Sequence, residues 1–311
     1  MLKILYERID KLNKMAPIWY PDYICLNSKA GEYYRDGEKQ IQYISNAELI
    51  KLSSEHKDLV VIIGCQTKEN IDKAISLCQE MKCEYKLIDD VIFKAYSISF
   101  QEVVEKYNGN YIDDFGNQIQ IGPTTQIPNG KVNFSTLHTK EKAVYDNYIN
   151  LDKNVTAKNL LIDVRSSKNI VSIEENTRII GCVIIISEKN RVKIGKDCLF
   201  ARDNEIRASN SHPIFDLDTH KRTNVKRDVI IGNHVWVGED CKFFPGTRIS
   251  DGSIVGASTN MSHDFADKNI IIAGSPAKCI RKNVIWAKDT QDMDDIEDFS
   301  QCNDHSALKY I

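Results

Sequence analysis

Several features that would place the chain in a familiar class are missing. Its 311 residues hold 41 Lys and Arg against 44 Asp and Glu, a net charge of −3, so no basic excess serves sequence-independent nucleic-acid binding. The longest apolar runs, such as residues 59–63 and 270–273, fall far short of the ~20 residues of a membrane-spanning helix. The first residues, MLKILYERIDKLNK, carry charges where a signal peptide has an apolar segment. We therefore expect no nucleic-acid partner, no transmembrane segment and no export.

The nine cysteines are odd in number and include no C-x-x-C pair, so neither a disulfide framework nor a zinc site is indicated. We expect them to be reduced and mostly buried, which places the chain in the cytoplasm. No spacing typical of metal ligands occurs elsewhere, so we expect no metal cofactor.

Residues 1–110 alternate strand-like and helix-like patterns. The β-branched run 59–63 ends at Gly64, a helical pattern follows through Cys78, and residues 85–88 resemble a second strand. This βαβ pattern predicts a small Rossmann-like α/β domain. The G-x-G-x-x-G turn of dinucleotide sites is absent, so no dinucleotide is assigned. Residues 111–154 are rich in turn formers, and we expect them to bridge two domains.

The strongest pattern is a six-residue repeat in the second half. A large apolar residue recurs at Ile231, Val237, Phe243, Ile249, Val255 and Met261. A small residue follows four places after each of the first five, at Val235, Cys241, Thr247, Ser253 and Thr259. Neither the 3.6-residue period of a helix nor the two-residue period of a strand can hold this repeat on one face. A coil that turns a corner every six residues places each large residue inside a triangular prism.

The same phase appears upstream of the regular hexads. Its members are Ile173, Ile179, Ile185, Ile194, Phe200 and Ile206. We therefore expect the solenoid to span residues 155–285 and a C-terminal tail to span residues 286–311. The phase breaks at the polar residues 213–224, which we expect to form a loop ejected from the prism.

His212 stands where this loop begins, at the hexad position after Ile206 that should hold an aliphatic residue. An imidazole with a pKa near 6.5 is suited to act as a general base near neutral pH. A histidine that only satisfies loop backbone groups is the alternative. Asp216 either orients the second ring nitrogen of His212 or is a solvated loop charge.

Two segments beside the repeats carry a resemblance to a known family. They are Ser209-Asn-Ser-His-Pro-Ile-Phe-Asp216 and Ala273-Gly-Ser-Pro-Ala-Lys278. With the hexads they resemble the hexapeptide-repeat acyltransferases, in the branch that contains bacterial capsule and lipopolysaccharide O-acetyltransferases, including those of sialic acid. The resemblance covers roughly residues 155–285 and does not reach the N-terminal domain. It implies a left-handed parallel β-helix, a homotrimer, acetyl-CoA as co-substrate and His212 as the general base.

The resemblance also implies where acetyl-CoA binds. Trp236 faces out from the prism, and the matching tryptophan of the family lies beside the acetyl-CoA channel; packing against a neighbouring subunit is the alternative. Gly238 and Gly256 either let pantetheine approach the backbone or are required by the coil. Ala257 and Ser258 at a corner could donate backbone amides to the pantetheine arm or the thioester oxygen.

Two basic residues complete the candidate site, and two histidines are rivals of His212. Lys278 and Arg281 follow the last turn, where the family places cations near the phosphates of CoA, although surface cations are often only solvated. His234, a turn residue expected at the surface, and His263, which follows the last clear hexad, are rival bases ranked below His212.

These observations predict an acetyl-CoA-dependent O-acetyltransferase that modifies a hydroxyl of a bacterial cell-surface glycan by direct transfer from the thioester. The glycan would be a capsule or lipooligosaccharide, including one that bears sialic acid. One alternative is N-acetylation of an amino sugar nucleotide, although those relatives bind the nucleotide through a glycine-rich turn that is absent after Ile63. An alternative of another class is a non-catalytic solenoid scaffold, since hexads require only packing.

Overall fold

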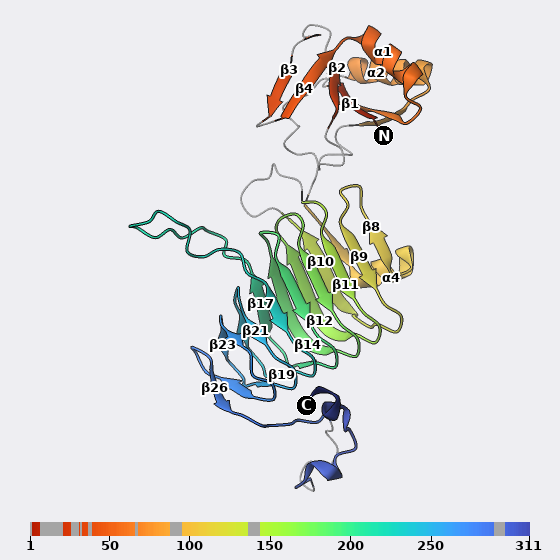
Figure 1. Cartoon of the computed structure of the whole chain (residues 1–311). Coiled ribbons are helices and arrows are strands. Elements are labelled where there is room, and N and C mark those ends of the chain that lie inside the picture. Colours follow the sequence, from red (N-terminus) through yellow and green to blue (C-terminus); the bar gives the residue numbers. More distant parts are fainter. Residues whose placement is uncertain are drawn as a thin grey trace. The chain divides into compact units, whose positions relative to one another are not determined.

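The chain divides into two compact units in a computed structural model (Figure 1). One unit comprises Met1–Lys94 with His138–Tyr145, and the other comprises Ala95–Leu137 with Asp146–Ile311. The structure describes residues 2–6, 21–25, 31, 33–36, 39–65, 68–87, 95–135, 144–288 and 296–311.

In its described residues, the N-terminal unit is a mostly parallel sheet with the helices α1 and α2. Its strands lie in the order β3-β4-β2-β1-β5-β6, and β5 pairs in parallel with β6 on either side of α2 in the sequence. Ile4, Leu49, Val61, Ala74 and Cys78 belong to its buried cluster. The elements are β1 (Leu2–Tyr6), β2 (Tyr23–Cys25), β3 (Tyr33–Asp36), β4 (Lys39–Ile44), α1 (Asn46–Glu55), β5 (Leu59–Ile63), α2 (Lys68–Met81) and β6 (Glu84–Leu87). Within the described residues, no helix of either unit is both long and apolar enough to cross a bilayer.

The second unit is a coil of mostly parallel strands, preceded by the strand β7 and a short helix. Its first elements are β7 (Tyr96–Ser99), α4 (Phe100–Tyr107), β8 (Asn110–Ile112), β9 (Gln118–Ile121), β10 (Asn129–Phe134), β11 (Tyr148–Leu151), β12 (Thr156–Val164), β13 (Ile170–Ile173), β14 (Arg178–Ile186) and β15 (Arg191–Ile194). The later strands are β16 (Leu199–Phe200), β17 (Asn204–Ala208), β18 (Val229–Ile231), β19 (Trp236–Val237), β20 (Lys242–Phe243), β21 (Arg248–Ile249), β22 (Ile254–Val255), β23 (Asn260–Met261), β24 (Asp264–Phe265), β25 (Ile271–Ala273) and β26 (Lys278–Arg281). The short helices η5 (Phe299–Gln301) and η6 (Ser306–Tyr310) end the chain.

Three columns of stacked strands form the faces of this coil. They are β16-β19-β22-β25 (face A), β17-β20-β23 (face B) and β15-β18-β21-β24 (face C). Trp236 pairs with Ile254, a step of 254 − 236 = 18 residues, which is three hexads per turn. The predicted three-sided parallel β-helix is therefore confirmed.

The interior of the coil holds the residues that the hexads predict. Ile231, Val237, Phe243, Val255 and Met261 are at most 1% exposed, and the small residues four places on are equally buried. Some small side chains also satisfy carbonyl groups at the corners, as when the Thr247 hydroxyl donates to the Met261 carbonyl at 2.8 Å. One large residue per face and one small residue per corner thus fill the prism.

The described residues 111–135 and 146–154 belong to the coil unit rather than to a bridge between two domains. β9 pairs in parallel with β11, β11 with β13, and β10 with β12, so these two segments are early turns of the coil. The prediction that the solenoid begins at residue 155 is therefore wrong. Turn formers here mark corners of longer, irregular turns: Thr156 pairs with Arg178, a step of 178 − 156 = 22 residues that breaks the six-residue phase.

A row of four buried asparagines supports one corner of these early turns. Asn117, Asn147, Asn169 and Asn190 each stand immediately before a strand of the same sheet. The Asn147 amide donates to the Asn117 side-chain oxygen at 2.8 Å, and the Asn169 amide donates to that of Asn147 at 2.9 Å. The Asn190 backbone N–H donates to Asn169 at 3.2 Å. Each asparagine therefore links one turn of the coil to the next.

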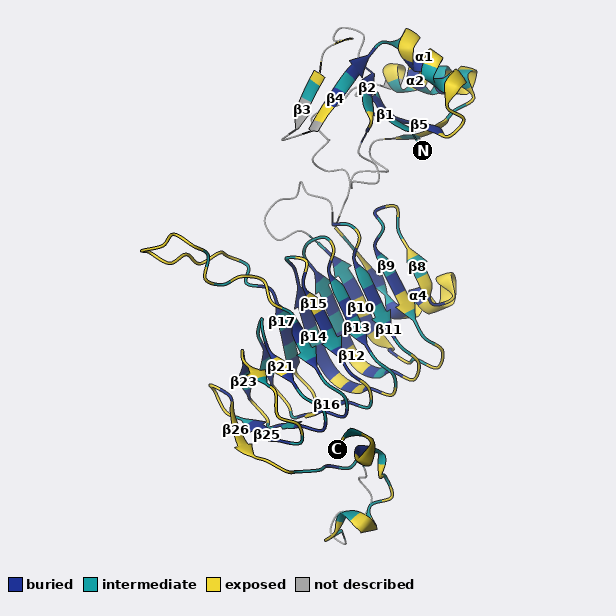
Figure 2. Ribbon diagram, in the orientation of Figure 1, coloured by how far each residue is buried: buried dark blue, intermediate teal, exposed yellow. Residues whose placement is uncertain are grey.

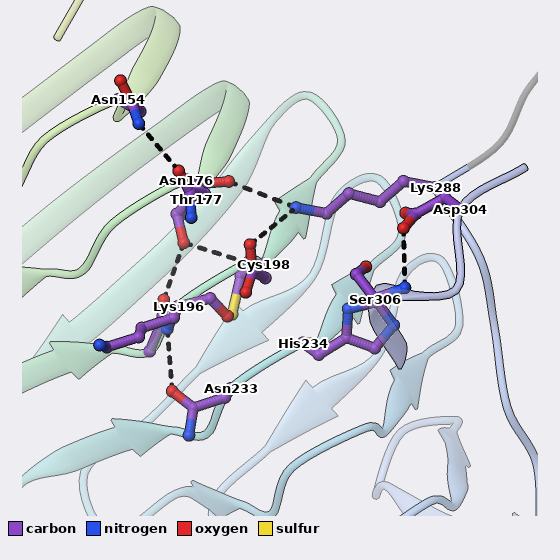
Figure 3. Close-up of polar contacts among 12 residues, drawn as sticks. Asn154, Asn176, Thr177, Lys196, Cys198, Asn233, His234, Lys288, Asp304 and Ser306 are labelled. Atoms are coloured by element: carbon purple, nitrogen blue, oxygen red, sulfur yellow. Dashed lines mark hydrogen bonds and ion pairs between the residues drawn. The ribbon is translucent and has the colours of Figure 1, made fainter. Parts of the chain in front are cut away.

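The C-terminal tail packs on the coil around His234. The Trp286 and Tyr310 rings stack on its imidazole with centroids 4.1 and 5.4 Å away. His234 Nε2 contacts the Trp286 carbonyl at 3.0 Å, and Trp286 Nε1 donates to the His234 carbonyl at 2.9 Å. The Lys288 amine donates to the Asn176 carbonyl at 3.3 Å, as Figure 3 shows beside the tail. His234 is 1% exposed, so the prediction that it lies at the surface is wrong, because the tail covers it.

Burial lowers the pKa of His234, and the nearby Lys288 ammonium acts in the same direction. The hydrogen bond to the Trp286 carbonyl and the Asp197 carboxylate oppose this shift. A charged imidazole would carry a second N–H at Nδ1, which has no hydrogen-bond partner among the described residues. The folded state therefore favours the neutral ring.

Replacing Asn147 by alanine should lower the free energy of unfolding by about 1–3 kcal/mol, because the buried polar groups of Asn117 and Asn169 lose their partner. Asn150→Ala, on an outward position of β11, is the control and should change stability by less than about 0.5 kcal/mol. Urea unfolding followed by circular dichroism measures both. Equal effects of the two substitutions would contradict a supporting role for the row.

Stability should fall as the pH drops below about 6.5, because the unfolded chain binds a proton at His234 that the folded chain excludes. His234→Asn should reduce this pH dependence between pH 7 and 5, by at most about 1.4 kcal/mol per pH unit for one proton. His220→Asn is the matched control, since both histidines have a positive φ (51° and 53°) and His220 is exposed. The melting temperature of each variant is measured across this pH range. If it depends on pH as steeply in His234→Asn as in the wild type, His234 is not the source of the pH dependence.

Candidate active site

The coil leaves its regular path at the end of β17. Ala208 and Ser209 are buried, and the chain then runs outward as a hairpin with a bridge between Phe215 and Arg222 before it returns at β18 (Figures 1 and 2). The predicted ejected loop is therefore confirmed. His212 is exposed at the root of this hairpin rather than at a core position, because the hexad phase already ends at Ser209.

Two asparagines hold the backbone of His212. The Asn224 side-chain amide donates to the His212 carbonyl at 2.8 Å, and the His212 N–H donates to the Asn210 carbonyl at 2.5 Å. The Asn224 side-chain oxygen accepts from the Ile214 N–H at 2.7 Å. Neither asparagine is among the site residues predicted from the sequence. They fix the point from which the imidazole projects.

The preceding turn of the coil anchors the same root. Arg222 and Glu188 form an ion pair at 2.5 Å, with both side chains largely covered, and the Ser187 hydroxyl donates to the Ser209 hydroxyl at 2.6 Å. The ion pair of Arg222 holds the returning leg of the hairpin, and the hydrogen bond of Ser209 holds its outgoing leg. The root is therefore attached to the rigid part of the fold, although the tip extends into solvent.

Asp216 serves the turn at the tip of the hairpin. Its carboxylate accepts the Thr219 N–H and the Thr219 hydroxyl, both at 2.8 Å, and these bonds lower its pKa. No contact between Asp216 and His212 occurs among the described residues. The geometry matches the loop-charge interpretation and not a carboxylate that orients the imidazole.

Trp236 lies on the outside of face A. It is 42% exposed, between Leu199 and Ile254 of the neighbouring turns, and Trp286 contacts it with a centroid distance of 6.0 Å. The predicted outward orientation is confirmed. The indole continues an apolar strip along face A and leaves part of its surface open to a ligand or a neighbouring subunit.

The coil itself requires Gly238. A Cβ atom there would lie 2.7 Å from the Ala257 backbone nitrogen, closer than real Cβ contacts, and backbone cannot move away cheaply. A Cβ on Gly256 would lie 3.2 Å from the Ala273 Cβ, which is tight. Stacking of the turns therefore explains these glycines without a ligand, and contact with pantetheine stays a prediction.

At the corner after β22, one backbone amide already donates a hydrogen bond within the coil. The Ser258 N–H donates to the Glu239 carbonyl at 2.8 Å, and the Ser258 hydroxyl donates to Asp240 at 3.3 Å. The Ser258 amide is therefore occupied within the coil and cannot also stabilise a thioester oxygen in this conformation. Ala257 lies exposed beside it.

Lys278 and Arg281 lie on β26, which folds back antiparallel on β25 at the end of face A. Both are exposed, and neither forms an ion pair with a described carboxylate. Their position at the last turn agrees with the prediction, and their contact with CoA phosphates is untested.

One chain does not bring the two halves of the candidate site together. Trp236, Gly238, Ala257 and Lys278 lie along face A, its following corner or its end, whereas His212 leaves the coil at the corner between faces B and C. In a three-sided coil, that corner is opposite face A. A site that uses both His212 and Trp236 therefore needs two copies of the chain.

The remaining candidates are the rival base His263 and any group of metal ligands. His263 is exposed at the same B–C corner, two turns beyond the hairpin root, and its Nδ1 lies 3.2 Å from the Ser262 hydroxyl. Across the described ranges, no group of three or more His, Cys, Asp or Glu side chains is arranged to hold a metal ion.

Comparisons with known proteins show which proteins the chain is similar to. No protein-family model matches the chain. It is 35% identical over 160 residues to a polysialic acid O-acetyltransferase of Escherichia coli O1:K1, an alignment that covers 51% of each chain, so it spans about half the length of that relative. It is 32% identical over 156 residues to the putative lipopolysaccharide biosynthesis O-acetyl transferase WbbJ of Escherichia coli K12, covering 46% of this chain and 78% of WbbJ. The solved polysialic acid O-acetyltransferase OatWY is 26% identical, with a TM-score of 0.47 and coverage of 61% and 98%. The chain therefore belongs to the hexapeptide-repeat acyltransferases, in the branch that contains O-acetyltransferases of bacterial polysialic acid and lipopolysaccharide.

Proposed function

We propose that the protein is an acetyl-CoA-dependent O-acetyltransferase that modifies a hydroxyl of a bacterial cell-surface glycan. The observation that carries the proposal is the placement of His212: an exposed imidazole whose backbone is fixed at the root of a hairpin on a rigid coil. The relatives named for O-acetyl transfer support the same reaction class.

In the proposed reaction, His212 accepts the proton of the acceptor hydroxyl as its oxygen bonds to the acetyl carbon. The carbon–sulfur bond of the thioester breaks, and the proton passes from the imidazolium to the leaving thiolate, so charge and atoms balance. The step requires a neutral imidazole at the start. The acetyl group moves directly to the acceptor, without a covalent enzyme intermediate.

We further propose a homotrimer of left-handed coils with active sites between neighbouring subunits. The opposite placement of His212 and Trp236 supports it, because each site then takes the histidine from one subunit and the tryptophan from the next. The hairpin also exposes Ile214, Phe215 and Leu217, the last at 90%, an apolar tip that a neighbouring subunit would cover. All nine cysteines are free thiols, which suits the reducing cytoplasm where we place the reaction.

The direct test is incubation with acetyl-CoA and a panel of bacterial glycans, read as thiol release and as mass gain of the acceptor. We expect release that depends on a hydroxyl-bearing glycan. Preference for amine-bearing sugar nucleotides would support N-acetylation instead. No release, together with no thermal shift on addition of acetyl-CoA, would support the scaffold.

His212→Ala should lower kcat by about 10²–10⁴-fold and leave the Kd of acetyl-CoA nearly unchanged, because it removes only the proton acceptor. The melting temperature of the same preparation reports any structural loss. A folded His212→Ala protein with near-normal turnover would end the assignment of His212 as the base and direct attention to His263.

Light scattering of the active protein should give three times the chain mass of 35.5 kDa. Coexpression of the His212→Ala and Trp236→Ala chains should restore about a quarter of the wild-type activity at low acetyl-CoA, because mixed trimers contain sites with both residues intact. Sites built within one chain would always carry one substitution, so absence of restored activity would refute the shared site.

A further inference from the structure

A cluster of basic side chains lies at the same B–C corner as His212. It surrounds a pocket of about 610 Å³. The residues that line it are Lys189, Asn190, Lys226, Arg227, Asp228, Gly246, Arg248, Ser262, His263 and Asp264. We call Lys189, Lys226, Arg227, Arg248 and His263 the basic corner.

Successive turns of the coil contribute these residues. The corners before β15, β18 and β24 and the first residue of β21 each supply at least one member, so residues far apart in the sequence form one row. The absence of a side chain at Gly246 accommodates Arg227, since a Cβ on that glycine would lie 3.0 Å from the Arg227 Cδ. The Arg248 N–H donates to the His263 carbonyl at 3.2 Å, which joins the last two turns.

The cations of the basic corner form no close ion pair with the carboxylates of the described residues. Among the described residues, none of Lys189, Lys226, Arg227 and Arg248 lies within 4.0 Å of a carboxylate oxygen. Elsewhere on the coil, cations pair with acidic neighbours, as in Lys193–Glu174 at 2.8 Å and Arg207–Glu205 at 2.6 Å.

Two acidic residues line the pocket with these four cations. Four positive charges less the charges of Asp228 and Asp264 leave +2 with His263 neutral. One Asp228 oxygen is already engaged, because it accepts the Arg191 N–H at 2.7 Å. The pocket therefore presents exposed, unpaired cations to an anion from outside the chain.

The basic corner adjoins the proposed base. Asn224, whose side chain holds the His212 carbonyl, is two residues from Lys226, a span of at most about 7 Å of chain. The corner of His263 lies two turns beyond the hairpin root, or roughly 10 Å at the spacing of stacked strands. A ligand in this pocket would thus lie within a few sugar units of the imidazole.

We propose that the basic corner binds carboxylate groups of an acidic glycan and so places the acceptor hydroxyl at His212; this rests on the proposed function. Guanidinium groups pair with carboxylates in two-bond geometry, and several cations along one row suit a chain with a charge on each sugar. The phosphates of CoA are the other anions of the reaction. Lys278 and Arg281, at the end of face A, are the cations proposed for them.

The test measures binding by titration calorimetry on the full chain at low salt, without acetyl-CoA. The probes are an oligomer of sialic acid, a neutral glucose oligomer and CoA. We expect the sialic acid oligomer to bind more tightly than the glucose oligomer. Arg227→Gln/Arg248→Gln should raise the Kd of the sialic acid oligomer by about tenfold or more and leave the Kd of CoA unchanged.

The matched control is Arg202→Gln/Arg207→Gln, which removes two arginines that pair with Glu239 and Glu205 on the same coil. It should bind the sialic acid oligomer as the wild type does. Unchanged binding by the Arg227/Arg248 variant, or equal binding of both oligomers to the wild type, would overturn the proposal. So would a loss confined to CoA, which would assign the basic corner to CoA phosphates. Because binding is measured without turnover, a failure of acetyl transfer would leave this result readable.

Discussion

The stacking of one turn of the coil on the next is the constraint on which the rest of the structure depends. Each face places one large side chain inside the prism, and these side chains pack against one another in the interior, as Phe200 of face A and Phe243 of face B do with ring centroids 6.3 Å apart. Adjacent backbones approach so closely that Gly238 admits no side chain. Because the turns cannot shift, every corner lies in a fixed row, and a residue inserted at a corner is held at a defined place on the surface.

The proposed site uses this property twice. The hairpin leaves the coil at the B–C corner, and its root is attached to the preceding turn. The backbone of His212 is therefore fixed while its ring lies outside the prism. Cations from turns further along the same corner gather in one row, although their positions run from 189 to 263 in the sequence. The residues expected to contact CoA follow face A, on the other side of the coil. In the proposed site these two groups come from neighbouring copies of the coil, so assembly is part of the proposed chemistry.

Much of the coil could be predicted from the sequence because packing repeats where the turns have 18 residues. Ile231, Phe243 and Met261 occupy the interior as the hexads require. The early turns escaped detection because their longer steps, such as Thr156 to Arg178, destroy the period while the pairing persists. The regular hexads also predicted a core position for His212, but the chain leaves the coil before reaching it.

The features that the sequence did not reveal depend on contacts between distant segments. His234 has the turn position that the repeat predicts, yet its burial comes from Trp286, 52 residues later. The basic corner has no local motif, because each turn contributes only one or two of its members. The role of Asp216 could not be decided from spacing, since its carboxylate can satisfy the turn that begins with it.

The most direct measurement is a crystal structure of the protein with CoA and an acceptor glycan. We expect the CoA sulfur and the acceptor hydroxyl to meet at the His212 imidazole of one subunit. Pantetheine should then follow face A of the neighbouring subunit, beside Trp236. A complex in which CoA and acceptor meet away from His212, or in which one subunit alone surrounds both, would contradict it.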